Sequence, residues 1–323
     1  MSANPCDLVN AGFPGEPARR ATLPKPLRGI VPPMLTPLRG RDELDLRGVE
    51  RVIEHILAGG VHGLFILGTS GEGPSLSYRL RRELVDRVCC QVAGRVPVLV
   101  GITDTSFVEA LHLAEHAAAA GAQAVVTSAP YYFPAGQPEL LEFLERLVPE
   151  LPLPLFLYNM PQMTKVRFEV DTLRQVLAVD KIVGIKDSSG DLDYFERLVE
   201  LKRTRPDWTV LLGPESLLVE AMRRGGDGGV PGGANIYPQL FVELFDALDR
   251  GNAAHAAALQ QQLLKLGAVY SVGRHASAVV KGMKCACSLL GLCEDFMAEP
   301  FHRFRAPERE RVRAILQDMG LLP

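Results

Sequence analysis

The chain has 323 residues, of which 47% are hydrophobic and 23% charged, and its formal net charge at pH 7 is −3. This balance is that of a globular protein, and such a small negative charge gives no attraction to nucleic acid or to an anionic membrane surface. No apolar run approaches the ~20 residues that would span a bilayer. We therefore expect neither a nucleic-acid nor a membrane partner.

Residues 1–28 are rich in proline, glycine and alanine and lack the continuous apolar core of a secretory signal. This composition predicts a flexible N-terminal extension. No Cys-x-x-Cys pair meets a second pair or two histidines, so the six cysteines predict no zinc site. We expect free thiols in a cytoplasmic protein with no metal and no cofactor.

Eight short apolar runs, each bounded by turn residues, recur as far as residue 230 at the spacing of a strand-plus-helix unit. They span 30–35, 63–67, 96–101, 124–128, 155–158, 182–186, 209–212 and 229–230. The intervals hold amphipathic helical patterns. These patterns cover 46–58, 77–93, 106–121, 140–148, 172–179, 193–202 and 216–224.

Continuous apolar strands that alternate with amphipathic helices predict a parallel sheet covered on both faces. A doubly wound open sheet would alternate in the same way, but the first strand is not followed by a Gly-x-Gly-x-x-Gly turn. Eight near-equal repeats favour a closed (β/α)8 barrel, which we place at 29–250. The remainder, 251–323, predicts a helical region with helices over 253–266, 277–290 and 307–319.

In such a barrel the catalytic groups lie at the C-terminal ends of the strands. Lys186 closes the sixth apolar run, so its amine is expected to enter the barrel mouth, where burial disfavours the ammonium and frees the lone pair to attack a ketone. A structural lysine paired with Asp187 is the alternative. Tyr158 closes the fifth run, and its phenol is placed either to relay protons or only to pack against the neighbouring strand.

The second strand ends in Gly-Thr-Ser-Gly-Glu-Gly at 68–73. Glycines and hydroxyls at a strand-to-helix turn can expose successive backbone N–H groups, which together bind an anion. A substrate carboxylate and a phosphate would both suit such a site, and a plain turn is the third possibility.

Taken together, the segments Gly-Thr-Ser-Gly-Glu at 68–72, Tyr-Asn-Met-Pro at 158–161 and Lys-Asp-Ser-Ser-Gly-Asp at 186–191 resemble the dihydrodipicolinate synthase and N-acetylneuraminate lyase family. The resemblance extends over about 28–300. It implies a (β/α)8 barrel with a C-terminal helical part, a homotetramer built from tight dimers, and class I aldolase chemistry without a metal.

The resemblance also assigns roles. Lys186 would form an imine with pyruvate or another 2-oxo acid, and Tyr158 would relay protons. Thr69 would link Tyr158 to a second tyrosine, best placed on Tyr132, which reaches across the tight dimer. The backbone N–H groups of Thr69 and Ser70 would hold the substrate carboxylate, and Val230 would line the pyruvate pocket.

Two positions bear on which member of the family this is. Dihydrodipicolinate synthases carry an arginine for the carboxylate of their aldehyde substrate where this chain has Met163. A thioether cannot replace a bidentate cation, and Lys165 is the nearest substitute. After the seventh strand, Glu215 and Ser216 are placed to contact a polyhydroxyl tail, although Ser216 is equally suited to cap the next helix.

The predicted reaction is therefore cleavage or formation of a 2-oxo acid, of the deoxy sugar acid type, with pyruvate and an aldehyde as the two halves. Three alternatives remain at this point. They are dehydration of a 2-oxo-3-deoxy sugar acid through the same imine, the dihydrodipicolinate synthase reaction, and a phosphate- or metabolite-binding barrel that uses the glycine-rich loop 231–235.

Overall fold

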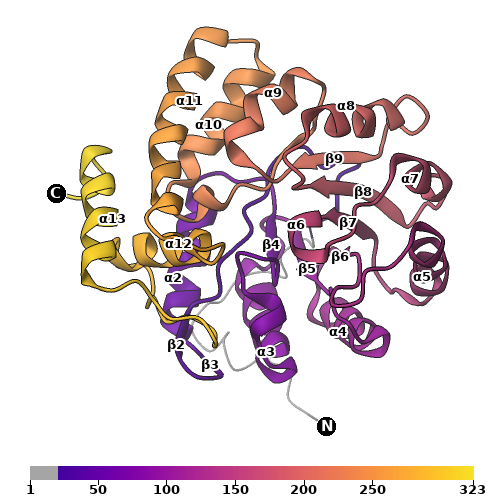
Figure 1. Ribbon diagram of the computed structural model, residues 1–323, viewed down its shortest axis with the longest axis horizontal. Helices are drawn as coiled ribbons and strands as arrows, with labels where there is room; N and C mark the ends of the chain where they lie inside the picture. Colours follow the sequence, from indigo (N-terminus) through magenta and orange to yellow (C-terminus); the bar gives the residue numbers. More distant parts are fainter. Residues whose placement is uncertain (1–20) are drawn as a thin grey trace.

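The computed structural model describes residues 21–323, and its centre is an eight-stranded parallel sheet surrounded by helices (Figure 1). The strands are β1 (Gly29–Ile30), β4 (Leu64–Ile66), β5 (Val98–Gly101), β6 (Ala124–Ser128), β7 (Leu155–Asn159), β8 (Ile182–Asp187), β9 (Thr209–Leu212) and β10 (Gly228–Gly229). Each is hydrogen-bonded to the next in the order β1-β10-β9-β8-β7-β6-β5-β4. Each overlaps one of the predicted apolar runs, although β1 and β10 share only one residue with theirs.

The two end strands meet through the residues that follow β1. Pro33 forms a parallel bridge with Phe65 of β4, the N–H of Met34 donates to the Phe65 carbonyl at 2.8 Å, and the Phe65 N–H donates to the Pro32 carbonyl at 2.9 Å. This pairing joins the first and last strands of the sheet. The predicted (β/α)8 barrel is confirmed.

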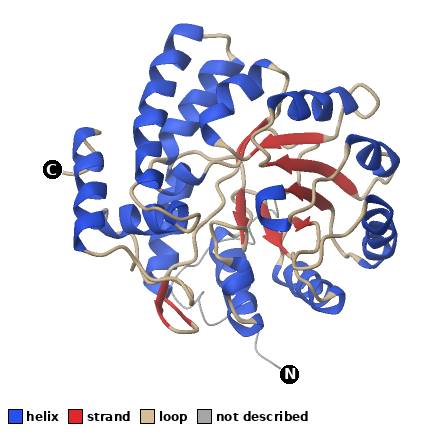
Figure 2. Cartoon of the chain, in the orientation of Figure 1, coloured by secondary structure: helices blue, strands red, loops and turns tan. Residues whose placement is uncertain are grey.

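Helices cover the outer face of the sheet (Figure 2). They are α2 (Leu46–Ala58), α3 (Tyr78–Val92), α4 (Phe107–Ala120), α5 (Gln137–Glu150), α7 (Val170–Val176), α8 (Leu192–Leu201), α9 (Leu218–Arg223) and α10 (Pro238–Asp249). The short α6 (Pro161–Thr164) instead follows directly on the end of β7 and lies near the strand ends. Ser77 and Ser106 cap α3 and α4, because their side chains accept from the N–H groups of Leu80 and Glu109. Three further elements were not predicted: α6, α10 and the hairpin β2–β3 (Leu38–Gly40 and Glu43–Leu44).

Strand residues alternate between the barrel interior and the layer between strands and helices. In β7, Leu155 and Leu157 pack outward, whereas Phe156 and Tyr158 point inward. The interior is filled by a group that we call the inner cluster: Leu27, Val31, Phe65, Leu99, Ala124, Val126, Phe156, Tyr158, Val183, Leu211 and Val230. Because both faces of every strand are covered, the sequence contains continuous apolar runs.

Leu27 belongs to the segment predicted as an N-terminal extension. It is fully buried in the inner cluster, and its N–H donates to Thr209 Oγ1 at 2.8 Å. Leu23 packs against the same cluster. Residues 21–28 therefore contribute to the barrel interior, while residues 1–20 of the predicted extension lie outside the described residues.

Beyond the barrel, the chain continues as α11 (Ala253–Gly267), the short helix η5 (Ala268–Ser271), α12 (Ala278–Leu289) and α13 (Ala306–Asp318). Figure 1 shows these elements, in orange and yellow, gathered on one side of the sheet. The three long helices match the predicted ones. Within residues 21–323, no helix is both long enough and apolar enough to cross a membrane.

Candidate active site

Lys186 and Tyr158 are direct neighbours at the ends of adjacent strands. They occupy paired register positions on β8 and β7, and both side chains point into the barrel. Lys186 Nζ lies 4.1 Å from the centre of the Tyr158 ring and 5.2 Å from the centre of the Phe65 ring. Only 6% of Lys186 is exposed, so aromatic faces replace water around its amine.

The Tyr158 hydroxyl lies 3.3 Å from Thr69 Oγ1. Burial is the largest single influence on this phenol and raises its pKa. The positive charge of Lys186 and the hydrogen bonds from Thr69 and Ser188 outweigh burial and leave the pKa below its usual value. A more acidic phenol gives up its proton more readily near neutral pH, which suits a proton relay.

Thr69 and Ser70 belong to the turn that follows β4, residues 67–73. Two non-glycine residues of this turn, Leu67 (φ +60°) and Glu72 (φ +54°), adopt the left-handed backbone conformation. Gly73 is required because a Cβ there would lie 2.1 Å from the Leu67 carbonyl oxygen. In the described part of the chain, the N–H groups of Thr69 and Ser70 have no protein acceptor, so both remain available to an anion.

Asp187 and Asn159, the last residues of β8 and β7, connect the two strand ends that carry Lys186 and Tyr158. Asn159 Nδ2 donates to Asp187 Oδ1 at 2.7 Å, and Ser189 donates to the same carboxylate through its N–H and its hydroxyl. Burial raises the pKa of Asp187, and these hydrogen bonds oppose the rise. The carboxylate therefore links the ends of β7 and β8, and it makes no ion pair with Lys186.

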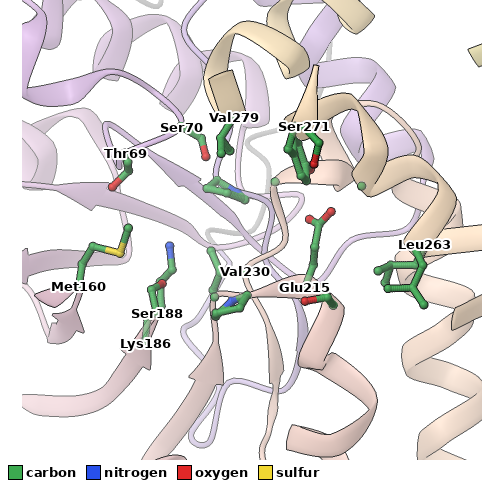
Figure 3. Close-up of a pocket in the computed structure, with 18 of the residues that line it drawn as sticks. Thr69, Ser70, Met160, Lys186, Ser188, Glu215, Val230, Leu263, Ser271 and Val279 are labelled. Atoms are coloured by element: carbon green, nitrogen blue, oxygen red, sulfur yellow. The ribbon is translucent and has the colours of Figure 1, made fainter. Parts of the chain in front are cut away.

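A cavity of about 550 Å³ opens above Lys186 (Figure 3). Seven of the predicted site residues line it: Thr69, Ser70, Tyr158, Lys186, Glu215, Ser216 and Val230. Tyr132 does not. It is 84% exposed, has φ +83°, and packs edge-to-face on Phe133 with ring centres 5.2 Å apart. This chain alone does not bring Tyr132 to the site.

Glu215 lies in the cavity wall with 9% of its surface exposed, and its Oε2 accepts a hydrogen bond from the Gly233 N–H at 2.8 Å. Burial raises its pKa to about 7, against the opposing effect of the Gly233 N–H and of the nearby Tyr270 hydroxyl. Ser216 is not the N-cap of α9, since Leu217 occupies that position. The alternative reading of Ser216 as a helix cap was therefore wrong.

The wall facing the strand ends comes from the C-terminal helical region, which the sequence analysis did not connect to the site. Its contributors are Leu263, Leu264, Gly267, Ala268, Tyr270, Ser271 and Val279. Figure 3 shows Leu263, Ser271 and Val279 around the space that Lys186 and Glu215 enter. The only sequence signal was an apolar helix followed by a short segment containing an isolated tyrosine.

Among residues 21–323, Lys186 is the only basic residue that lines the cavity. Met163 is 48% exposed and lies outside it. Lys165 Nζ donates to the Gln162 carbonyl at 2.7 Å and does not reach the cavity. The described residues therefore place no second cation in the cavity for a carboxylate on the far half of a substrate.

Known proteins resemble this chain over nearly its whole length. Residues 26–319 match the model of the "Dihydrodipicolinate synthetase family". The chain is 32% identical over 303 residues to "Probable 2-dehydro-3-deoxy-D-pentonate aldolase YjhH" of Escherichia coli (strain K12), which covers 93% of this chain and 99% of that protein.

Solved structures of the same family are also similar to this chain. Dihydrodipicolinate synthase from Bacteroides thetaiotaomicron is 49% identical with a TM-score of 0.88, over 91% of this chain and 99% of that one. A second solved structure is that of YagE, a prophage protein of the dihydrodipicolinic acid synthase family from E. coli K12, in complex with pyruvate. It is 30% identical to this chain with a TM-score of 0.86, and the match covers 91% of this chain and 99% of that one.

The barrel and its cavity are those of an enzyme of the lyase class. The chain belongs to the dihydrodipicolinate synthetase family, and the resemblance noted in the sequence is confirmed.

Proposed function

We propose that this enzyme cleaves a 2-oxo-3-deoxy sugar acid to pyruvate and an aldehyde, or forms the acid from them, through an imine on Lys186. The observation that carries the proposal is the pairing of Lys186 and Tyr158 at the mouth of the barrel, with a hydroxyl and two unpaired N–H groups from the 67–73 turn beside them. An amine, a proton relay and a carboxylate site are the groups that this reaction needs.

In the first half of the reaction, the nitrogen of Lys186 attacks C2 of the 2-oxo acid. Tyr158 passes a proton to the departing oxygen, and loss of water leaves a protonated imine. The N–H groups of Thr69 and Ser70 hold the carboxylate, and Val230 packs beside C3. Fixing the substrate in this way converts a two-molecule encounter into a positioned one.

In the second half, Tyr158 accepts the proton of the C4 hydroxyl while the C3–C4 bond breaks. The bonding electrons pass into the imine, which becomes an enamine, and the aldehyde leaves. Protonation at C3 and hydrolysis then release pyruvate and the free amine. No redox step or external cofactor is required.

The relatives' names favour this reaction over the synthase reaction only in part, because a structure that is 49% identical is described as a dihydrodipicolinate synthase. The exposed Met163 and the lack of a second cation among the described residues of the cavity wall argue against an aldehyde that carries a carboxylate. Product analysis separates the remaining alternatives, because an aldolase releases pyruvate and a dehydratase releases a dioxo acid without loss of carbon.

Borohydride trapping with pyruvate, followed by peptide mass mapping, tests the imine. A reduced pyruvyl adduct on Lys186 is expected, and Lys186→Ala is expected to form none and to be inactive. A folded wild-type protein that forms no adduct with pyruvate or with longer 2-oxo acids would contradict the proposal. So would full activity of Lys186→Ala.

We also propose a cytoplasmic homotetramer of tight dimers in which Tyr132 enters the site of the partner subunit. The exposed aromatic pair Tyr132 and Phe133 supports this assembly, because large exposed apolar side chains commonly mark protein interfaces.

A further inference from the structure

Two buried polar atoms of the cavity wall, Glu215 Oε1 and the hydroxyl oxygen of Tyr270, lie close enough to influence each other. Neither makes a hydrogen bond of normal length and angle to any residue in the described part of the chain. Native proteins rarely leave such atoms unpaired, and a missing ligand or water is a common reason when they do. Both residues line the cavity that contains Lys186, which makes substrate the natural partner.

The backbone around Glu215 Oε1 and the Tyr270 hydroxyl leaves space in front of both atoms. Glu215 uses its other oxygen, Oε2, to accept from Gly233. A Cβ at Gly233 would lie 2.9 Å from Glu215 Oε1, and a Cβ at Gly232 would lie 3.4 Å from the Tyr270 hydroxyl. Any side chain at either glycine would therefore crowd these two atoms, and the glycine pair keeps the space in front of them free.

The polar groups of this cavity wall favour hydroxyl groups over charged groups of a substrate. An unpaired carboxylate oxygen accepts a hydrogen bond, and a phenol both donates and accepts, so together they are complementary to alcohol groups. Around them lie apolar side chains, Leu263, Leu264 and Val279. A phosphate or carboxylate would have to give up its water here without a cation in return, and beside the Glu215 carboxyl.

We propose that Tyr270, together with Glu215, is the specificity site that receives hydroxyl groups of the aldehyde half and restricts it to uncharged, unphosphorylated hydroxyaldehydes. This inference rests on the proposed aldolase function, in which the pyruvate half occupies the space beside Lys186. The C-terminal helical region then supplies a substrate-recognition residue from η5.

The test is Tyr270→Phe, which removes only the hydroxyl, with Tyr237→Phe outside the cavity as the matched control. Condensation of pyruvate is measured with D-glyceraldehyde, with propanal, which has the same carbon chain without hydroxyls, and with D-glyceraldehyde 3-phosphate. The wild type is expected to prefer glyceraldehyde and to reject the phosphate ester.

Tyr270→Phe is expected to lower kcat/KM for glyceraldehyde about tenfold, the size of one lost hydrogen bond to a substrate hydroxyl. Its kcat/KM for propanal and its borohydride adduct on Lys186 are expected to be unchanged, which also shows that the variant is folded. Glu215→Gln, as a second variant, is expected to change the ratio of the two aldehydes in the same direction.

Three results would overturn the assignment. The first is a Tyr270→Phe variant that traps pyruvate normally and uses glyceraldehyde as well as the wild type does. The second is a wild type that turns over the phosphate ester or propanal as efficiently as glyceraldehyde. The third is the absence of any Lys186 adduct in the wild type, which would remove the proposed function itself and is distinguished from the other two by the trapping experiment.

Discussion

At the scale of single residues, the most informative feature is the alternation of side chains along β7 and β8. Because successive strand residues face opposite sides, the inward position of Phe156 also sends Tyr158 inward. On β8 the alternation is interrupted by a register shift at 182–184, so Val183 and, three residues later, Lys186 both face the interior. The lysine that ends this apolar strand could be recognised from the sequence, whereas the shift that turns it inward could not. The distance of this lysine from the tyrosine depended on strand register, which the sequence does not state.

The raised pKa of the Glu215 carboxyl can be tested through the pH dependence of the free energy of unfolding, without an activity assay. This carboxyl has a pKa of about 7 in the folded chain, against an ordinary value of 4.5. Between these two pH values, the unfolded chain loses the proton while the folded chain keeps it. Stability therefore falls as pH rises through this window, by at most about 3 kcal/mol.

Glu215→Gln removes this titration and can still accept from the Gly233 N–H. We expect the variant to gain in free energy of unfolding relative to wild type between pH 4.5 and pH 7, and to hold a constant advantage above that range. Urea denaturation over a pH series measures this. Parallel curves for the two proteins would show that the carboxyl titrates normally.

At the scale of elements, the positions of all eight strands and most helices followed from local periodicity. The contacts that complete the cavity did not, because they join residues that are distant in sequence. Glu72 in the 67–73 turn forms an ion pair with the fully buried Lys284 of α12, and it also accepts from the Ala298 N–H at 2.9 Å. Nothing in the local pattern around either residue indicated this pairing.

The Glu72–Lys284 pair should hold the turn that presents Thr69 and Ser70. Lys284→Met leaves the Glu72 charge buried without its cation, and we expect a loss of about 3–5 kcal/mol in the free energy of unfolding. Pyruvate affinity in the trapping experiment should fall as well, because the anion-binding turn loosens.

Two comparisons sharpen this test. The double variant Glu72→Gln/Lys284→Met should recover much of the lost stability, since no charge remains uncompensated. Lys202→Met breaks the Lys202–Asp227 pair outside the cavity and should destabilise the chain without changing pyruvate affinity. Equal effects of Lys202→Met and Lys284→Met on pyruvate affinity would contradict a special role for the pair at the turn.

At the scale of the whole molecule, the exposed Tyr132 and Phe133 bear on assembly. Phe133→Asp places a charge in the proposed dimer interface. We expect smaller species in sedimentation experiments and a lower kcat, because Tyr132 no longer reaches the partner's site. Phe301→Asp changes another exposed phenylalanine, 43% accessible, and should leave both measurements unchanged. An undisturbed assembly in Phe133→Asp would place the interface elsewhere.

The C-terminal wall of the cavity has a consequence for how such enzymes diverge. Its lining residues fall within 263–279, one continuous stretch of sequence, whereas Lys186, Tyr158 and Thr69 lie on or just after barrel strands. A short deletion or exchange within that stretch would alter the accepted aldehyde while every strand end kept its place. Evolution, or directed mutagenesis, can thus change the substrate range of this barrel without rebuilding its chemistry.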